Sequence, residues 1–305
     1  MCAADTHTGF LSTSSQGLRQ AIPPMRLWHK AKKLGIWDPQ SIDLSQDELD
    51  WARLTGPQQD VILRLTALFQ AGEESVTLDL LPLMMVIAQE GRLEEEMYLT
   101  SFLWEEAKHV EAFRRFLDEV AHDRSDLSRF HTPNYRTIFY EQLPRAMYRL
   151  RADSSPEAQA IASVTYNMIV EGVLAETGYH AYFSMLERNA ILPGMQSIIA
   201  HLKQDESRHL AYGVYLLSRL VAESGESVWS AIEARMAEMI VPAIGVIDDL
   251  FSQYEGDVPF GLQVDEFVAY AMSQFQKRMD RIERARTQTL EQVNQVAVEE
   301  ELAEQ

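Results

Sequence analysis

Two Glu-x-x-His motifs, 100 residues apart, constrain the fold of this chain more than any other feature. They are Glu106-x-x-His109 and Glu206-x-x-His209. On an α-helix, residues three apart differ by about 60° around the axis and about 4.5 Å along it, so each motif can direct a carboxylate and an imidazole to one point. A third copy, Glu119-x-x-His122, has no carboxylate at the matching distance upstream, so we interpret it as accidental.

Further glutamates precede both motifs by similar distances. Glu73 or Glu74 precedes the first motif, and Glu171 precedes the second. Helical periodicity does not choose between Glu73 and Glu74, since each shares a stripe with apolar residues. Four Glu and two His from four helices form the ligand set of ferritin-like dimetal carboxylate bundles. The pattern therefore predicts an all-α fold, a ferritin-like four-helix bundle core with additional helices and a dimetal carboxylate site inside it.

The chemistry of this residue set favours two metal ions over its alternative, a set of solvated acidic helix faces. Burying four carboxylates without counter-charge costs several kcal/mol for each ion, and two divalent cations remove that penalty. Ligands rich in oxygen, with one nitrogen for each metal, suit iron or manganese. Sulfur ligands are absent from the pattern, which argues against a structural zinc site.

The helical pattern predicts one domain. We expect an irregular N-terminal arm over residues 1–24, a single ferritin-like helical domain over 25–291 and an acidic tail over 292–305. Long helices are expected from Thr55 to about Gln89 with a break at Pro82, over 93–120, from Ser155 onward, and after Pro193-Gly194. Segments 135–151, 228–254 and 264–291 also show helical patterns, whereas 122–134 is expected to be a loop.

Composition narrows the possible partners and location. A net charge of -19 disfavours nucleic acids and anionic membrane surfaces as partners. The single cysteine, Cys2, excludes an intramolecular disulfide. The N-terminal residues lack the order of charged and apolar segments typical of a signal peptide, so we expect a cytoplasmic protein.

Two residues close to the motifs are candidates for supporting roles. Asp205 directly precedes Glu206 and could accept the free N–H of a metal-bound imidazole such as His109. Tyr166 lies five residues before Glu171 and could point toward the metals, although most tyrosines in such positions are simply packed in a core.

Several segments resemble the small subunit of ribonucleotide reductase over roughly residues 25–220. They are 37–45 (WDPQSIDLS) with Asp47 and Trp51, and both metal motifs. Within that superfamily, segments 71–76 (AGEESV), 95–100 (EEMYLT) and 105–109 (EEAKH) look most like the ligand-binding oxidases.

This resemblance implies a heterodinuclear site. It selects Glu73 over Glu74. Manganese would be held by Glu73, Glu106 and His109, and iron by Glu171, Glu206 and His209, with two irons as the alternative.

The resemblance also implies ligands and redox residues. A long-chain fatty acid or similar lipid would bind at the metals, and activation of O2 would join the phenolic oxygen of Tyr166 to the β-carbon of Val76. Trp37, Asp205 and His109 match the path by which reductase small subunits pass electrons to the metals, with an unknown electron donor. The implied assembly is a homodimer.

Two departures favour an oxidase over a reductase subunit. Phe113 occupies the position, four residues after the first histidine, where most small subunits carry a radical tyrosine. No Phe, Tyr or Trp follows Phe275, whereas reductase subunits relay a radical through an aromatic residue near their C-terminus. The leading hypothesis is thus an Mn/Fe oxidase that attacks C–H bonds. The alternatives are a reductase small subunit and a non-catalytic protein that binds metal or lipid.

Overall fold

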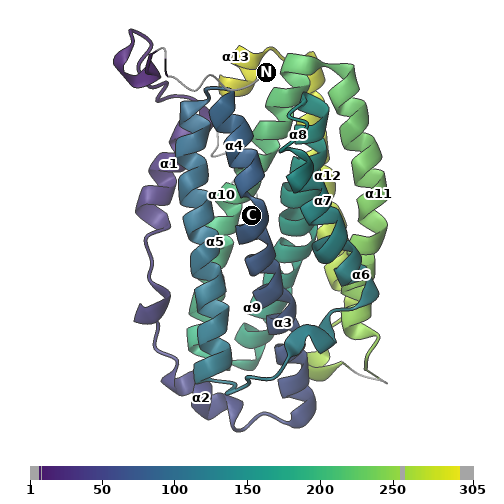
Figure 1. The fold of residues 1–305 in the computed structure, drawn as a ribbon. Coiled ribbons are helices and arrows are strands. Elements are labelled where there is room, and N and C mark those ends of the chain that lie inside the picture. Colours follow the sequence, from purple (N-terminus) through teal and green to yellow (C-terminus); the bar gives the residue numbers. More distant parts are fainter. Residues whose placement is uncertain (1–6, 8, 255–257, 296–305) are drawn as a thin grey trace.

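A computed structural model describes residues 7, 9–254 and 258–295, and in these ranges the regular elements are helices, with no strand (Figure 1). The acidic tail beyond residue 295, and Cys2, lie outside the described residues. The all-α fold predicted from the sequence is confirmed. No helix within the described ranges is both long and apolar enough to cross a membrane.

Four long rods form the core of the bundle. They are α3 (Gly56–Asp79), α5 (Leu93–Glu119), the continuous run of α8 (Pro156–Ser163), η5 (Val164–Ala175) and α9 (Glu176–Asn189), and α10 (Pro193–Ser224). Helix α3 packs on α5, and α10 packs on α5, η5 and α9. Large apolar side chains from all four rods, including Ile62, Phe102, Ile169 and Leu217, are fully buried between them.

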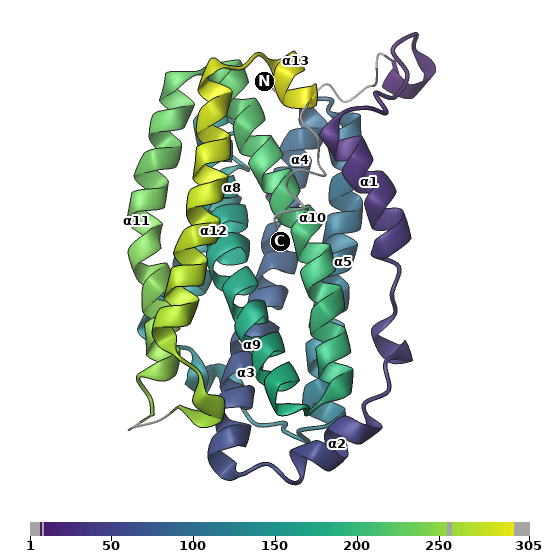
Figure 2. The same cartoon turned by 180° about the vertical axis from the view of Figure 1, so that it is seen from behind.

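Further helices cover this core from outside. Helix α1 (Pro23–Leu34) packs on α5 and α10, whereas α11 (Glu226–Phe251) and α12 (Val264–Arg284) cover η5. In both views α1 and α11 lie at opposite edges of the molecule (Figures 1 and 2). The remaining elements are η1 (Leu11–Thr13), η2 (Pro39–Ser41), α2 (Ser45–Trp51), η3 (Leu127–Phe130), α6 (Pro133–Arg136), η4 (Thr137–Gln142), α7 (Leu143–Arg149), η6 (Pro259–Gly261), η7 (Ala285–Thr287) and α13 (Leu290–Gln295).

The first long rod is broken where its proline predicts. Thr55 and Gln58 form a capping box at the start of α3, which satisfies two backbone N–H groups that have no helical acceptor. Helix α3 ends at Asp79, and α4 (Leu81–Gln89) begins one residue before Pro82. A proline in the first turn of α4 has no helical N–H to lose. The break leaves Glu73 in the last two turns of α3.

Other boundaries differ from the sequence expectations. The predicted loop over 122–134 contains η3, and α6 begins at Pro133. The helix expected over 264–291 ends at Arg284, and a short turn separates it from α13. Segment η5 is wound as a π-helix over twelve residues, which helical periodicity did not anticipate. Such wide turns occur frequently at functional sites, and this one carries Tyr166 and Glu171.

Candidate metal centre

Six side chains from the four rods meet in the interior of the bundle. They form two overlapping groups of atoms close enough to hold metal ions, one of Glu73, Glu106, His109 and Glu206, the other of Glu106, Glu171 and His209. All six residues are buried. The neighbour that the sequence left as an alternative, Glu74, is exposed on the outer side of α3.

Both imidazoles present Nδ1 to this cluster. Glu106 directs Oε2 to His109 Nδ1 at 3.5 Å and Oε1 to His209 Nδ1 at 3.3 Å. Glu206 does the same, with Oε1 at 3.4 Å from His109 Nδ1 and Oε2 at 3.5 Å from His209 Nδ1. The sequence assigned each of these glutamates to one metal position, whereas the geometry gives each of them one oxygen on either side. They are therefore placed to bridge two ions.

The other two glutamates, Glu73 and Glu171, each lie beside one of the two imidazoles. Glu73 Oε2 lies 3.2 Å from His109 Nδ1, and Glu171 Oε1 lies 3.8 Å from His209 Nδ1. Asn167, one turn before Glu171, donates from Nδ2 to its Oε2 at 2.9 Å. The Tyr179 hydroxyl donates to Glu73 Oε1, and nothing in the spacing of the motifs pointed to that tyrosine.

Buried atoms without a hydrogen-bond partner show that the cluster fits cations. Four buried side-chain atoms in it have no hydrogen-bond partner, namely Glu106 Oε2, Glu171 Oε1, Glu206 Oε2 and His209 Nδ1. Leaving such groups buried and unsatisfied costs about 1–3 kcal/mol each, and more where they are charged. All four are acceptor atoms when the acids are ionised and the imidazole is neutral. A donor set of carboxylate oxygens and imidazole nitrogens suits manganese or iron.

Burial and neighbouring charges move the pKa values of the glutamates in this cluster in opposite directions. Burial raises the pKa of Glu73 to about 8, and burial together with the charge of Glu206 raises the pKa of Glu171. Burial alone would also raise the pKa of Glu106, but hydrogen bonding to His109 and the charge of His209 lower it. The protein without cations thus holds some of its outer carboxyl groups protonated. Binding divalent ions would displace those protons.

A second layer of acids holds the far side of each imidazole. His109 Nε2 donates to Asp205 Oδ2 at 3.2 Å, and His209 Nε2 donates to Glu105 Oε2 at 2.9 Å. The sequence analysis pointed to Asp205 as an acceptor for His109. It missed Glu105, although the 100-residue offset that relates the motifs also relates Glu105 to Asp205. These bonds fix which nitrogen of each ring faces the metal cluster.

Two buried cations neutralise this second layer. The Arg208 guanidinium, 1% exposed, donates from Nη2 to Glu105 Oε1 at 2.6 Å and also to Asp205 Oδ1. Lys108 Nζ donates to Asp205 Oδ2 at 3.2 Å and to the Gly35 carbonyl at 2.6 Å. Lys108 and Arg208 obey the same offset, so the repeated unit is acid-Glu-x-base-His. The full unit can be read in the sequence at 105–109 and 205–209.

Trp37 connects this layer to the outside of the bundle. Its Nε1 donates to Asp205 Oδ2 at 2.8 Å, and its ring stacks on His201 with centroids 5.0 Å apart. Trp37 itself is half-buried. A continuous hydrogen-bonded connection therefore runs from the partly exposed Trp37 through Asp205 to His109.

Comparison with known proteins decides the family. The model of the ribonucleotide reductase small-chain family matches residues 24–286. The chain belongs to that family. A solved R2-like ligand-binding oxidase, a valine-to-leucine variant with anaerobically reconstituted Mn/Fe cofactor, is 40% identical, with a TM-score of 0.84 over 90% of this chain and 98% of the other.

Further solved structures place the chain in the oxidase group of the small-chain family. A glycine-to-leucine variant of the R2-like ligand-binding oxidase, also with anaerobically reconstituted Mn/Fe cofactor, has a TM-score of 0.85 at 40% identity, with the same coverage. Another structure of a glycine-to-leucine variant holds a non-activated Mn/Mn cofactor after aerobic reconstitution with Mn and Fe, again with a TM-score of 0.85, 40% identity and the same coverage. The recognition made from the sequence is confirmed.

Phe113 and Tyr166, two residues that the sequence singled out, both have defined partners. Phe113 occupies the position where most small subunits carry a tyrosine. Its ring stacks on that of Phe69 with centroids 5.3 Å apart, and Phe69 stacks on Tyr179 with centroids 4.3 Å apart. Tyr166 lies close to the other residue of its predicted pair: its hydroxyl donates to the backbone carbonyl of Val76 at 3.1 Å. The same hydroxyl lies 3.5 Å from Glu106 Oε1.

An apolar cavity opens beside the metal cluster. Glu73, Glu106, Glu171 and Glu206 lie in its wall. The rest of the lining is apolar or aromatic apart from Thr177 and the Tyr135 hydroxyl, and includes Leu68, Phe69, Val76, Val246 and Phe251. The small residues Ala175 and Gly178 are also in the wall, whereas Gly172 is close to Arg278 and Leu210.

The accidental motif has no part in this centre. His122 Nε2 lies 2.8 Å from Glu48 Oε1 on the surface. Its Nδ1 donates to the backbone carbonyl of Asp118 at 3.0 Å. His122 therefore belongs to a surface ion pair.

Proposed function

We propose that this member of the small-chain family is a dinuclear metal oxidase, with manganese held by Glu73, Glu106 and His109 and iron held by Glu171, Glu206 and His209. The observation that carries the proposal is the cluster of buried acceptor atoms without hydrogen-bond partners, in a chain 40% identical to oxidases solved with an Mn/Fe cofactor. Glu106 and Glu206 would contribute to both positions. First-row preferences place iron above manganese in a common site, so an Fe/Fe pair is the alternative.

We further propose that the apolar cavity holds a long-chain fatty acid or similar lipid whose carboxylate lies at the metals. The lining supports this, because acidic residues occupy one region of the wall and apolar residues the rest. An anionic headgroup among four glutamates is favourable only with cations present. Apolar lining favours burial of a hydrocarbon chain by about 25 cal/mol for each Å² removed from water.

The proposed reaction on the protein joins Tyr166 to Val76. Loss of the phenolic hydrogen and of the hydrogen on the valine β-carbon releases two electrons and two protons, and a carbon–oxygen bond forms. Reduction of O2 to two waters takes four electrons and four protons; a bound metal pair would supply the other two electrons, and solvent the other two protons. The position of the Tyr166 hydroxyl, 3.1 Å from the backbone carbonyl oxygen of Val76 and 3.5 Å from Glu106 Oε1, supports this proposal. Glu106 Oε1 is the nearest carboxylate oxygen that could accept the phenolic proton.

Intact-protein mass spectrometry tests the proposal. After aerobic loading with manganese and iron, we expect a mass lower by about two hydrogens, with the peptides of Val76 and Tyr166 joined. Tyr166→Phe is the matched control, because it keeps the ring and removes the oxygen that forms the bond. An unchanged mass in protein shown to hold both metals would refute the oxidation and favour a protein that only binds metal or lipid.

The lipid and metal assignments need separate measurements. Gly72 lines the cavity, and a Cβ built there would meet Phe139 at 3.5 Å, so Gly72→Leu would project into the space without a backbone clash. Lipid extracted with the wild type should be absent from this variant while both metals remain.

Anomalous diffraction at the two absorption edges would reject the mixed pair if iron filled both positions. The homodimer and the cytoplasmic location remain predictions from the sequence.

A further inference from the structure

The lysines of this chain are concentrated around Trp37. The chain has six lysines. Lys30, Lys32 and Lys33 lie on α1. Lys108 contacts the Trp37 ring. Lys203 follows by two positions His201, whose ring stacks on Trp37. The sixth, Lys277, is exposed on α12. Helix α12 covers η5, on the other side of the bundle core (Figure 2).

This distribution reverses the charge of the protein locally. Residues 6–37 contain five basic residues and no acidic one, in a chain whose net charge is -19. Arg19, one of these five, is paired with Glu94 at 2.9 Å, whereas Lys32 and Lys33 are exposed in the last turn of α1. Positive potential is therefore focused where α1 ends and the chain turns to Trp37.

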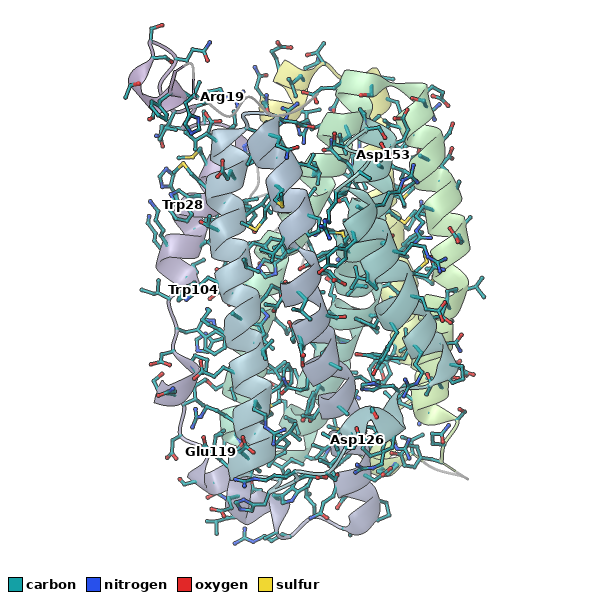
Figure 3. All side chains as sticks on the ribbon, viewed as in Figure 1. Arg19, Trp28, Trp104, Glu119, Asp126 and Asp153 are labelled. Carbon is teal, nitrogen blue, oxygen red and sulfur yellow. The ribbon has the colours of Figure 1, made fainter. Side chains whose placement is uncertain are left out.

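Exposed apolar side chains lie in the same region. Ile36 is 66% exposed and Trp104 is 47% exposed. Lys108 Nζ lies 4.4 Å from the ring centre of Trp37 and 4.5 Å from that of Trp104, so both rings flank one ammonium group. Figure 3 shows Trp28 and Trp104 along the same outer edge of the molecule, on α1 and α5. We define the lysine face as Lys30, Lys32, Lys33, Leu34, Ile36 and Trp104.

The lysine face ends at a hydrogen-bonded connection between the surface and the metal cluster. Trp37 lies beside it and is linked through Asp205 to His109. An electron donor that binds there would stand at the outer end of that connection. Because electron transfer slows steeply with distance, a docking position elsewhere on the bundle would be less effective.

We propose that the lysine face is the docking surface for a small one-electron carrier protein with an acidic surface. The inference rests on the proposed oxidase function, which needs a donor. In each encounter the carrier loses one electron and the metal pair gains it, so two encounters reduce a fully oxidised pair. Complementary charge would raise the association rate and make it sensitive to salt. The apolar rim would supply the contact area typical of the centre of an interface.

An anionic membrane is the competing partner for a basic helix, and the packing of α1 disfavours it. The apolar residues Pro24, Met25, Leu27 and Ala31 are buried against the bundle. Helices that bind in the membrane interface insert such a face among the lipids. On α1 this face is already occupied by contacts with α5 and α10.

Stopped-flow reduction of the aerobically loaded protein by a reduced plant-type [2Fe–2S] ferredoxin tests the proposal. We expect the wild-type rate to fall steeply as salt is raised. Lys33→Glu should lower the rate at low salt by about tenfold. Lys277→Glu makes the same substitution on another face, and its reduction rate should stay within about twofold of the wild-type rate. Hydroquinone, a small uncharged reductant, should reduce all three proteins equally.

Carbodiimide crosslinking of the metal-free protein to the same ferredoxin gives a second readout. Crosslinks should map to the peptide that carries Lys32 and Lys33. Equal rates for Lys33→Glu and Lys277→Glu, crosslinks on other faces, or preferential binding to vesicles of anionic phospholipid would overturn the docking surface. If hydroquinone reduces no metal pair, the oxidase proposal fails, whereas the crosslinks still decide the docking surface.

Discussion

Replacing Arg208 by methionine should destabilise the protein strongly, because this guanidinium neutralises both acids that hold the metal-binding imidazoles. Its partners Glu105 and Asp205 are fully buried. Asp205 would keep Lys108 at 3.2 Å and Trp37 at 2.8 Å. Glu105 would keep only its bond to His209, at 2.9 Å, among the contacts described. Removing one partner of a buried ion pair costs about 3–5 kcal/mol. Since Asp205 retains a cation, we expect the lower end, about 3 kcal/mol.

Urea unfolding of the metal-free protein measures this loss. With a slope of about 3 kcal/mol/M, a loss of 3 kcal/mol moves the midpoint by about 1 M. Arg188→Met is the control, because the ion pair of Arg188 with Glu266 is largely exposed and worth at most about 1 kcal/mol. Metal affinity should also fall, by about 10–100-fold, since His209 loses a fixed acceptor. A change below about 1 kcal/mol with unchanged metal affinity would refute our account of the second layer.

Three further predictions follow from single contacts. Burial raises the pKa of Asp79 to about 6, so the contribution of this carboxyl group to stability should be fully present below its ordinary pKa and be lost as pH rises through 6. Asp79→Asn should remove that fall, a gain of up to roughly 3 kcal/mol at pH 7.5 in urea unfolding; equal pH profiles would contradict it. Trp37→Phe removes the bond to Asp205, worth about 1.5–3 kcal/mol, and should slow reduction of the metal pair roughly tenfold or more in stopped flow, with metal content unchanged. A Cβ at Gly178 would lie 2.5 Å from the Phe69 ring, so Gly178→Ala should cost about 1–3 kcal/mol. Adding Phe69→Leu should recover part of that loss, and no recovery would show that the ring is not the obstacle.

Much of the fold and of the cluster could be predicted because both depend on local sequence rules. Proline and capping residues determine where α3, α8 and α10 begin, and a three-residue spacing puts a carboxylate beside an imidazole on any helix. Neither rule says how four rods rotate against one another. The sharing of Glu106 and Glu206 between both sides therefore appeared only in three dimensions.

The residues that were missed have their partners far away in the chain. Tyr179 reaches Glu73 across 106 positions, and the stack of Phe69 between Phe113 and Tyr179 combines three separate elements. Glu105 and Arg208 could have been found from the 100-residue offset. The π-helical winding of η5 could not, because helical periodicity assumes a uniform turn and η5 departs from it over twelve residues.

The crossed bonds of the second layer couple the two halves of the chain. Helix α5 supplies the acid that holds the ring on α10, and α10 supplies the acid that holds the ring on α5. A fragment ending before α8, or one beginning there, would contain no complete metal position with its supporting acid. Any slide of α10 along α5 would turn both rings at once, so a change at one ion should be felt at the other. Oxidation of the two metals as a pair would then be favoured by the way the chain is folded as well as by the ions themselves.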